Sequence, residues 1–169
     1  MRFRGFVSAA VLLTVAAACG GKDEAKPPSS TREKYVPVVP TKVSEGTGPC
    51  GLLSQAEIAA AVGQPFNAGE GISSEGAGSC SWHLRGSATQ LVNVVTLSPG
   101  GDPYQQTLST AAKPIEPISG VGERAFIATD TVWAFKGPRV VAVQVVTSQP
   151  LNSRKQFATK LAQTAIERA

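Results

Sequence analysis

The chain has 169 residues, of which 42% are apolar, and its 16 Lys and Arg against 12 Asp and Glu give a formal net charge of +4. This apolar fraction excludes a wholly disordered chain, and the length leaves room for one domain. Arg2 and Arg4 lie at the extreme N-terminus, so the remainder is too weakly basic to favour nucleic acid as a partner. One His and three Cys are poor material for a metal site, and we expect no metal and no cofactor.

Residues 1–18 predict a lipoprotein signal peptide. A short basic start precedes the apolar run 6–18, whose helical length of about 20 Å falls short of a hydrocarbon core of about 30 Å. Ala17 and Ala18 stand directly before Cys19, as small residues do in the bacterial lipobox. We therefore expect export, cleavage before Cys19, and attachment of the chain to the outer face of the cell membrane through a lipid on Cys19. The alternative is an ordinary secretory signal, with Cys19 incidental.

The number of cysteines supports lipidation. An odd cysteine count in an exported chain leaves one thiol without a disulfide partner. If Cys19 carries the lipid, Cys50 and Cys80 remain as a pair in an oxidising compartment, which favours a disulfide between them. The competing interpretation is that Cys50 and Cys80 are reactive thiols or metal ligands.

Residues 19–48 are expected to be a lipidated cysteine followed by a tether. After Gly20-Gly21 the segment is rich in charged residues, Pro, Ser and Thr, and it has no long apolar periodicity. One short apolar stretch, residues 35–39, leaves open an edge strand that packs on the domain. The globular domain is expected over residues 49–169.

This domain begins with a helix signal. Ser54 is a predicted N-cap with Glu57 as its capping-box partner, and Leu53 and Ile58 form a predicted hydrophobic staple. Gly63 is expected to end the helix. A Gly- and Ser-rich loop should follow as far as Gly78.

Alternating residues then predict strands. Cys80 and Trp82 alternate with polar residues, which places both on the buried face of a strand, and residues 90–97 are expected to pair with this strand through a turn at Gly86-Ser87.

The second half of the domain repeats this pattern loosely. Asp102 and Pro103 are typical of the N-cap and first residue of a helix. Three antiparallel strands are expected at 125–128, 131–135 and 140–146, followed by a helix over 152–168. The predicted fold class is α+β: a single domain with an antiparallel sheet of about five strands, helices packed against it, and one disulfide. A duplicated unit is a further hypothesis, because each half has a helix and then a hairpin.

Three motifs resemble those of a family of actinobacterial secreted lipoproteins of unknown function. They are the Pro-Cys-Gly-Leu-Leu-Ser run at 49–54, the Cys-Ser-Trp run at 80–82, and the Gly-Val-Gly-Glu-Arg-Ala-Phe run at 120–126. The resemblance implies a location in the cell envelope and a disulfide between Cys50 and Cys80. It supplies no activity.

Candidate catalytic features are sparse. His83 is the single histidine, follows Trp82, and is expected on the solvent side of its strand. Gly120 and Gly122 resemble a phosphate-binding loop, but they precede a predicted strand instead of opening a helix, so we interpret them as a turn with positive φ. We assign no catalytic residue.

A binding groove is the remaining hypothesis for a site. Trp133 and Phe135 lie on one face of a predicted strand, with Glu123 and Arg124 as possible rim charges; core packing is the competing explanation for the two aromatic residues.

Three functions follow from the sequence. The first is a non-enzymatic binding or accessory module of the envelope, whose partner is a small apolar ligand, a protein or a polymer. The second is a carrier of lipid or a small apolar ligand, which requires a large cavity between helices and sheet. The third is an envelope hydrolase or transferase, which requires several ionisable groups in one pocket.

Overall fold

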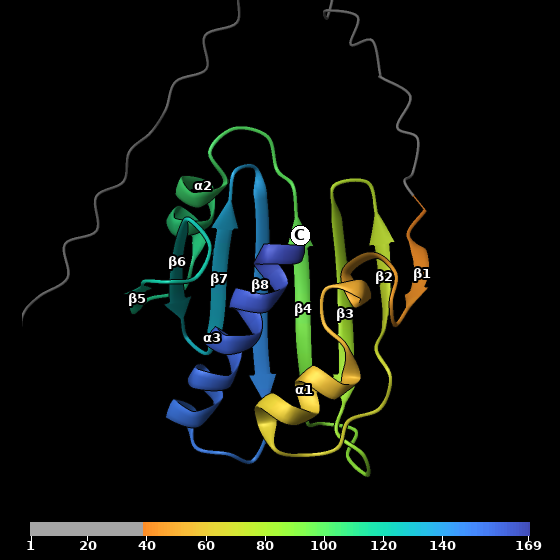
Figure 1. The fold of residues 1–169 in the computed structure, drawn as a ribbon. Helices are drawn as coiled ribbons and strands as arrows, with labels where there is room; N and C mark the ends of the chain where they lie inside the picture. The colour runs from red at the N-terminus through yellow and green to blue at the C-terminus, as the bar shows by residue number, and fades with distance from the viewer. Residues whose placement is uncertain (1–38) are drawn as a thin grey trace, which may run out of the picture. The chain divides into compact units, whose positions relative to one another are not determined.

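A computed structural model describes residues 39–169 (Figure 1). The signal peptide, Cys19 and the 35–38 part of the candidate edge strand lie outside the described residues. The helical elements are η1 (Gly48–Gly51), α1 (Gln55–Val62), α2 (Pro103–Thr110) and α3 (Leu151–Arg168). The strands are β1 (Thr41–Ser44), β2 (Glu70–Ser74), β3 (Ala77–His83), β4 (Leu91–Leu97), β5 (Ile115–Ile118), β6 (Arg124–Ala128), β7 (Thr131–Lys136) and β8 (Arg139–Val146).

The strands form one antiparallel sheet in the order β1-β2-β3-β4-β8-β7-β6-β5. The α+β class is therefore confirmed, but the sheet has eight strands where about five were expected. Two four-stranded units, β1–β4 and β5–β8, meet where β4 pairs with β8.

The five expected strands are the central ones, and the three additional strands lie outside them, with β1 and β5 at the two edges. β5 contains Pro117, which has no N–H to donate and is tolerated at a sheet edge. β2 replaces the expected Gly- and Ser-rich loop, because Gly71 lets the backbone of Ser79 approach where a side chain would collide. Each of the three is too short or too polar to show a period of two.

β1 also changes the expected domain organisation. It pairs with β2 from Thr41 to Ser44, within the segment expected to be a tether. The sheet thus begins eight residues before residue 49, the expected start of the domain.

The predicted start of α1 is confirmed. Ser54 Oγ accepts from the backbone N–H of Glu57, and the Glu57 carboxylate accepts from the backbone N–H of Ser54 at 2.8 Å. Leu53 and Ile58 are both buried, and Gly63 ends the helix with a φ of 75°. Asp102 caps α2 as expected.

Helices cover the two faces of the sheet unequally. α3 packs across β7 and β8 and contacts α1, while η1 lies against β1–β4 on the same face (Figure 1). The core between these elements includes Trp82, Val94 and Ile166, none of them exposed to solvent.

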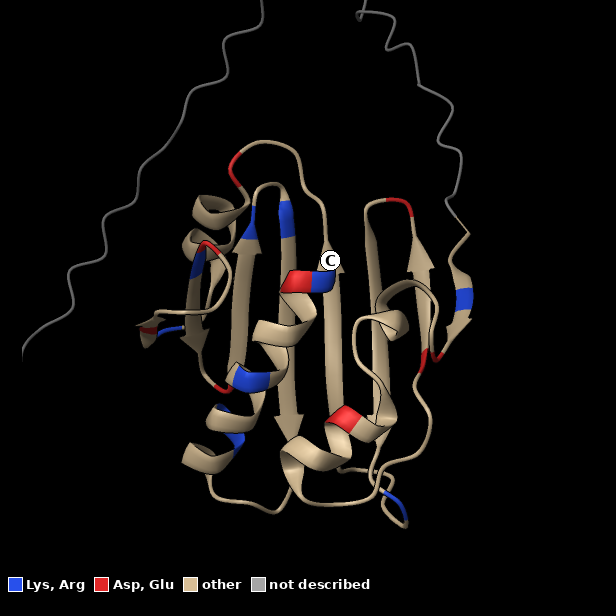
Figure 2. Cartoon of the chain, viewed as in Figure 1, with Lys and Arg blue, Asp and Glu red and all other residues tan. Residues whose placement is uncertain are grey.

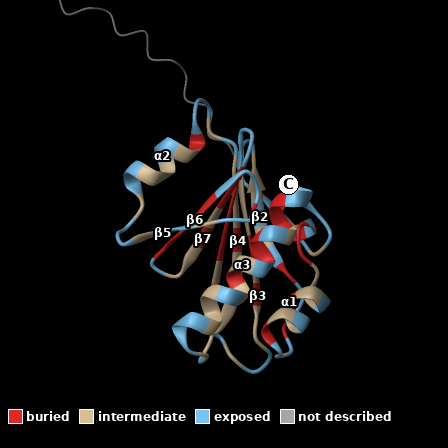
Figure 3. Ribbon diagram, turned by 60° about the vertical axis from the view of Figure 1, so that its left-hand side comes forward, coloured by how far each residue is buried: buried red, intermediate tan, exposed pale blue. Residues whose placement is uncertain are grey.

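α2 lies on the opposite face, apart from α1 and α3 (Figure 3). It packs through Tyr104 and Leu108 on a second cluster that contains Phe126, Phe135 and Val140. This cluster occupies the β5–β8 half, so the same face of β2–β4 has no helix over it among residues 39–169.

Candidate functional site

A disulfide joins η1 to the sheet. Cys50 of η1 and Cys80 of β3 are bonded, with their Cα atoms 5.1 Å apart, and neither residue is exposed. The expected disulfide is therefore confirmed, and it fixes η1 against the middle of the sheet.

Trp82 packs beside this disulfide. A Cβ atom on Gly69 would lie 2.6 Å from Trp82 Nε1 and 2.9 Å from Cys80 Sγ, so the indole and the sulfur occupy the space that a side chain would take. Trp82 is fully buried, and its Nε1 has no hydrogen-bond partner in the described part of the chain. Cys80 and Trp82 of the Cys-Ser-Trp motif are therefore part of the packed core.

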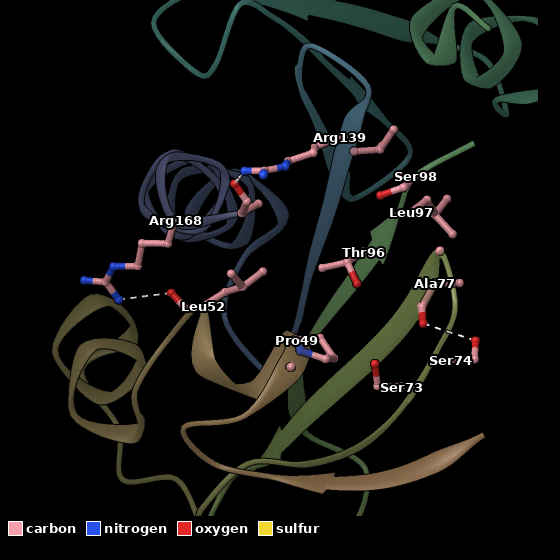
Figure 4. Close-up of a pocket in the computed structure, with 14 residues that line it drawn as sticks. Pro49, Leu52, Ser73, Ser74, Ala77, Thr96, Leu97, Ser98, Arg139 and Arg168 are labelled. Atoms are coloured by element: carbon pink, nitrogen blue, oxygen red, sulfur yellow. Dashed lines mark hydrogen bonds between the residues drawn. The ribbon is translucent and has the colours of Figure 1, made fainter. Parts of the chain in front are cut away.

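A pocket of about 360 Å³, here called the terminal pocket, lies where α3 ends above the strands (Figure 4). Hydroxyl groups contribute one side of its lining, from Ser73, Ser74, Thr96 and Ser98. Arg139 and Arg168 contribute the cationic groups. The η1 wall of the pocket, which includes Pro49, is the part that the disulfide holds in place.

Both arginines of the terminal pocket already have partners. Arg139 donates to the backbone oxygen of Ala169. Arg168 donates to the backbone oxygen of Leu52 at 3.0 Å and forms an ion pair with Glu57, whose Oε1 lies 2.6 Å from Arg168 Nη2. The charge of Arg168 is therefore compensated by Glu57, whereas Arg139 is held by a hydrogen bond to a backbone oxygen.

Arg168 also changes the titration of Glu57. Its guanidinium donates to the carboxylate, the N–H of Ser54 adds a second hydrogen bond, and together they lower the pKa of Glu57 from 4.5 to about 2. Because the folded-state pKa is depressed, this contribution to stability is complete above pH 4.5 and is lost as the pH falls towards 2.

We expect Glu57→Gln to lower the free energy of unfolding by about 0.5 to 1 kcal/mol at pH 7, since Gln keeps the capping box but loses the exposed ion pair. Urea unfolding of the wild type and the variant should show this difference shrinking between pH 4.5 and about 2. Glu167→Gln, which neutralises the carboxylate next in sequence to Arg168, serves as control. A difference that is independent of pH would contradict the role of the carboxylate charge.

A second hollow of about 380 Å³, here called the α2 groove, lies on the other face of the sheet. Thr107 and Thr110 of α2 form one side, and Trp133, Thr131 and Gln144 extend from β7 and β8. Trp133 is half-buried and stacks on Phe126, with ring centroids 6.4 Å apart. Its indole therefore belongs partly to the core and partly to the groove.

The four residues predicted for a groove do not share one site, although Glu123 and Arg124 both line a hollow of about 320 Å³. Trp133 lines the α2 groove, whereas Phe135 is buried in edge contact with Tyr104. Arg124 lies 4.3 Å over the Tyr104 ring and pairs with Asp102. The Glu123 carboxylate accepts a hydrogen bond from the backbone N–H of Gly137, in the turn between β7 and β8.

The glycine motif has a structural role, and His83 lies away from both hollows. Gly120 and Gly122 form the expected turn, with φ of 78° and 57°. A Cβ on Gly122 would lie 2.6 Å from the backbone oxygen of Phe135, so this position also requires close approach of the backbone. His83 lies on the open face of β3, opposite Leu91, and lines neither hollow.

Within residues 39–169, no three His, Cys, Asp or Glu side chains gather as a metal site would require, and no helix combines the length and apolar character of a membrane span. The charged side chains are instead spread singly or in pairs over the surface (Figure 2).

The family described as "Protein of unknown function (DUF3558)" matches residues 14–168, which include every described helix and strand. The chain belongs to the DUF3558 family. Neither a curated protein nor a solved structure is significantly similar to it.

Membership in DUF3558 agrees with the resemblance to a family of unknown function and assigns no reaction. In this DUF3558 domain, sequence reasoning found the disulfide pair and Trp133 but missed both hollows. The terminal pocket is lined by residues of six elements spread over the whole domain, and no local pattern marks it.

Proposed function

We propose that this DUF3558 protein is an exported, lipid-anchored binding module of the cell envelope and that it has no catalytic activity of its own. Its anchor is the lipid on Cys19, and its globular domain presents a binding surface to another component of the envelope.

The pairing of the other two cysteines supports lipidation of Cys19. Cys50 and Cys80 are bonded to each other and fully buried, so neither is accessible for lipidation. Cys19 is then the one cysteine left, and it follows the small residues that a lipoprotein signal peptidase accepts. A buried disulfide also suits an oxidising compartment outside the cytoplasm.

The surface chemistry supports binding over catalysis. Most of the lining of the terminal pocket and the α2 groove consists of hydroxyl, amide and apolar groups. The two cations of the terminal pocket have partners, and Asp130 of the α2 groove pairs with Arg154. A hydrolase or transferase would be expected to gather several ionisable groups with perturbed pKa values in one place. The space between α3 and the sheet is filled by fully buried side chains, which does not favour the carrier hypothesis.

We expect Cys19→Ser to release the exported chain from the membrane without changing its fold. Each buried methylene of an acyl chain contributes about 0.8 kcal/mol, so loss of the lipid should move most of the protein from the detergent phase to the aqueous phase of a phase-separation assay. Circular dichroism and thermal unfolding of both forms provide the control for folding. If the variant stays in the detergent phase although residues 1–18 have been removed, Cys19 is not the anchor.

A further inference from the structure

The open face of the sheet carries a continuous line of polar side chains, here called the polar row. Glu70, Ser81, Asn93, Gln144 and Thr131 lie directly opposite one another, in that order, on β2, β3, β4, β8 and β7. Since directly paired residues of an antiparallel sheet project from the same face, all five side chains share one surface. Strands lie about 4.8 Å apart, so the polar row is roughly 19 Å long.

The hydrogen bonds that Asn93 and Gln144 make leave one donor and one acceptor free at the centre of the polar row. Ser81 Oγ donates to Asn93 Oδ1 at 3.0 Å, which leaves Asn93 Nδ2 as a donor. Gln144 Nε2 donates to Asp130 Oδ1 at 2.9 Å, which leaves Gln144 Oε1 as an acceptor. Asn93 and Gln144 are direct neighbours, so they offer a donor beside an acceptor, the arrangement that a hydroxyl group can satisfy on both sides.

A more apolar line of side chains runs parallel to the polar row. It consists of the paired residues Ile72, Ser79, Val95, Ala142 and Trp133. Ile72 is 50% exposed at one end, and the half-buried indole of Trp133 lines the α2 groove at the other. Thr131 and Gln144 of the polar row line the same groove, so both lines lead into a hollow of about 380 Å³.

The charge on this surface disfavours an anionic partner. Glu70 is the charged member of the polar row, and it is acidic. At the other end, Asp130 accepts from Gln144 and pairs with Arg154 at 3.5 Å. A polyanion requires several uncompensated Lys or Arg side chains along its path. Lys42, which lies opposite Ile72 on β1, is the single cation among the paired residues of the two lines.

We propose that the polar row and the α2 groove bind a neutral carbohydrate chain. A sugar has hydroxyl groups that donate and accept together and apolar C–H faces that pack on aromatic rings. The polar row supplies partners for the hydroxyl groups, and Trp133 supplies an aromatic ring for the C–H faces. The length of the polar row suits a few linked sugar rings. This inference names the class of ligand that the proposed binding module takes. It rests on the proposed function only in one respect, that the lipid anchor places the domain in the envelope.

The test uses the full exported chain with Cys19→Ser, screened for binding to an array of neutral polysaccharides, with heparin as the polyanion. Binding of at least one neutral glycan and not of heparin is expected. Asn93→Ala combined with Gln144→Ala should weaken binding about tenfold or more, because each lost hydrogen bond costs roughly 0.5 to 1.5 kcal/mol. Gln163→Ala, an exposed amide on α3 and on the other face of the sheet, should leave binding unchanged.

Trp133 provides an independent readout. Trp82 is fully buried, so a change in tryptophan fluorescence on addition of the glycan should come from Trp133 and disappear in Trp133→Phe. Absence of binding to every neutral glycan, preference for heparin, or full binding by the Asn93 and Gln144 double variant would each overturn the proposal. Because binding is measured on purified protein, it is independent of whether Cys19 anchors the chain.

Discussion

Replacement of Cys50 and Cys80 together by Ala should lower the free energy of unfolding by about 3.5 kcal/mol, the chain-entropy value for a loop of this size. The two residues are 30 apart in sequence and both are fully buried. Ala is preferred to Ser in this test because a buried hydroxyl without a partner would add a cost of its own. The melting temperature should fall by roughly 10 to 15 °C.

Reduction provides the matched control for this prediction. Dithiothreitol should lower the melting temperature of the wild type towards that of the double variant and should leave the variant unchanged. Equal melting temperatures of wild type and variant under oxidising conditions would contradict a stabilising disulfide. Since η1 forms a wall of the terminal pocket, loss of the disulfide should also loosen that pocket before the central strands open.

Substitution of Trp82 by Ala should cost about 3 to 5 kcal/mol, the range for removal of a fully buried large aromatic side chain. The indole fills the space over Gly69 and beside the Cys80 sulfur, and no part of it is exposed. Removal of the ring leaves a cavity that the rigid strands β2, β3 and β4 can close only in part. Chemical denaturation with linear extrapolation measures the loss.

The variant Trp82→Phe separates the contribution of apolar packing to stability from the effect of the buried indole N–H. Phe keeps most of the apolar volume and removes the Nε1–H group that is buried without a partner, so it should cost less than half as much as Ala. Trp133→Ala should also cost less than Trp82→Ala, since Trp133 is only half-buried. A cost for Trp82→Phe equal to that for Trp82→Ala would show that packing alone does not explain the role of this residue.

Much of the central fold could be predicted from local signals. The capping box of Ser54 and Glu57, the Asp102-Pro103 start of α2 and the alternation around Cys80 and Trp82 all specify structure within a few residues of themselves. The strands β3, β4, β6, β7 and β8 each bury at least one face, so their sequences carry a readable period.

The outer strands β1, β2 and β5 could not be predicted in this way. Their side chains are mostly exposed or half-exposed, and β2 and β5 contain Gly71 and Pro117, which argue against a strand when taken locally. β2 and β5 form because β3 and β6 would otherwise have unpaired backbone groups, and β1 in turn pairs with β2.

The candidate binding surface was predictable in one residue only. The alternation in β7 places Trp133 on a face with bulky side chains, but whether that face is core or groove depends on where α2 ends. Glu70, Ser81, Asn93, Gln144 and Thr131 carry no common signal in the sequence. Each belongs to a different strand, and only the register brings them into one line.

Local patterns were enough to predict the α+β class, the central strands and the helix starts, because each depends on contacts or periodicities within a few residues. The odd cysteine count favoured the pairing of Cys50 with Cys80. Which face of each strand is covered, and which polar residues become neighbours, depends instead on how the sheet and helices pack. One residue of register shift would move every side chain of a strand to the opposite face. The site proposed for carbohydrate is therefore a property of the assembled sheet, whereas the anchor proposed at Cys19 is a property of a few consecutive residues.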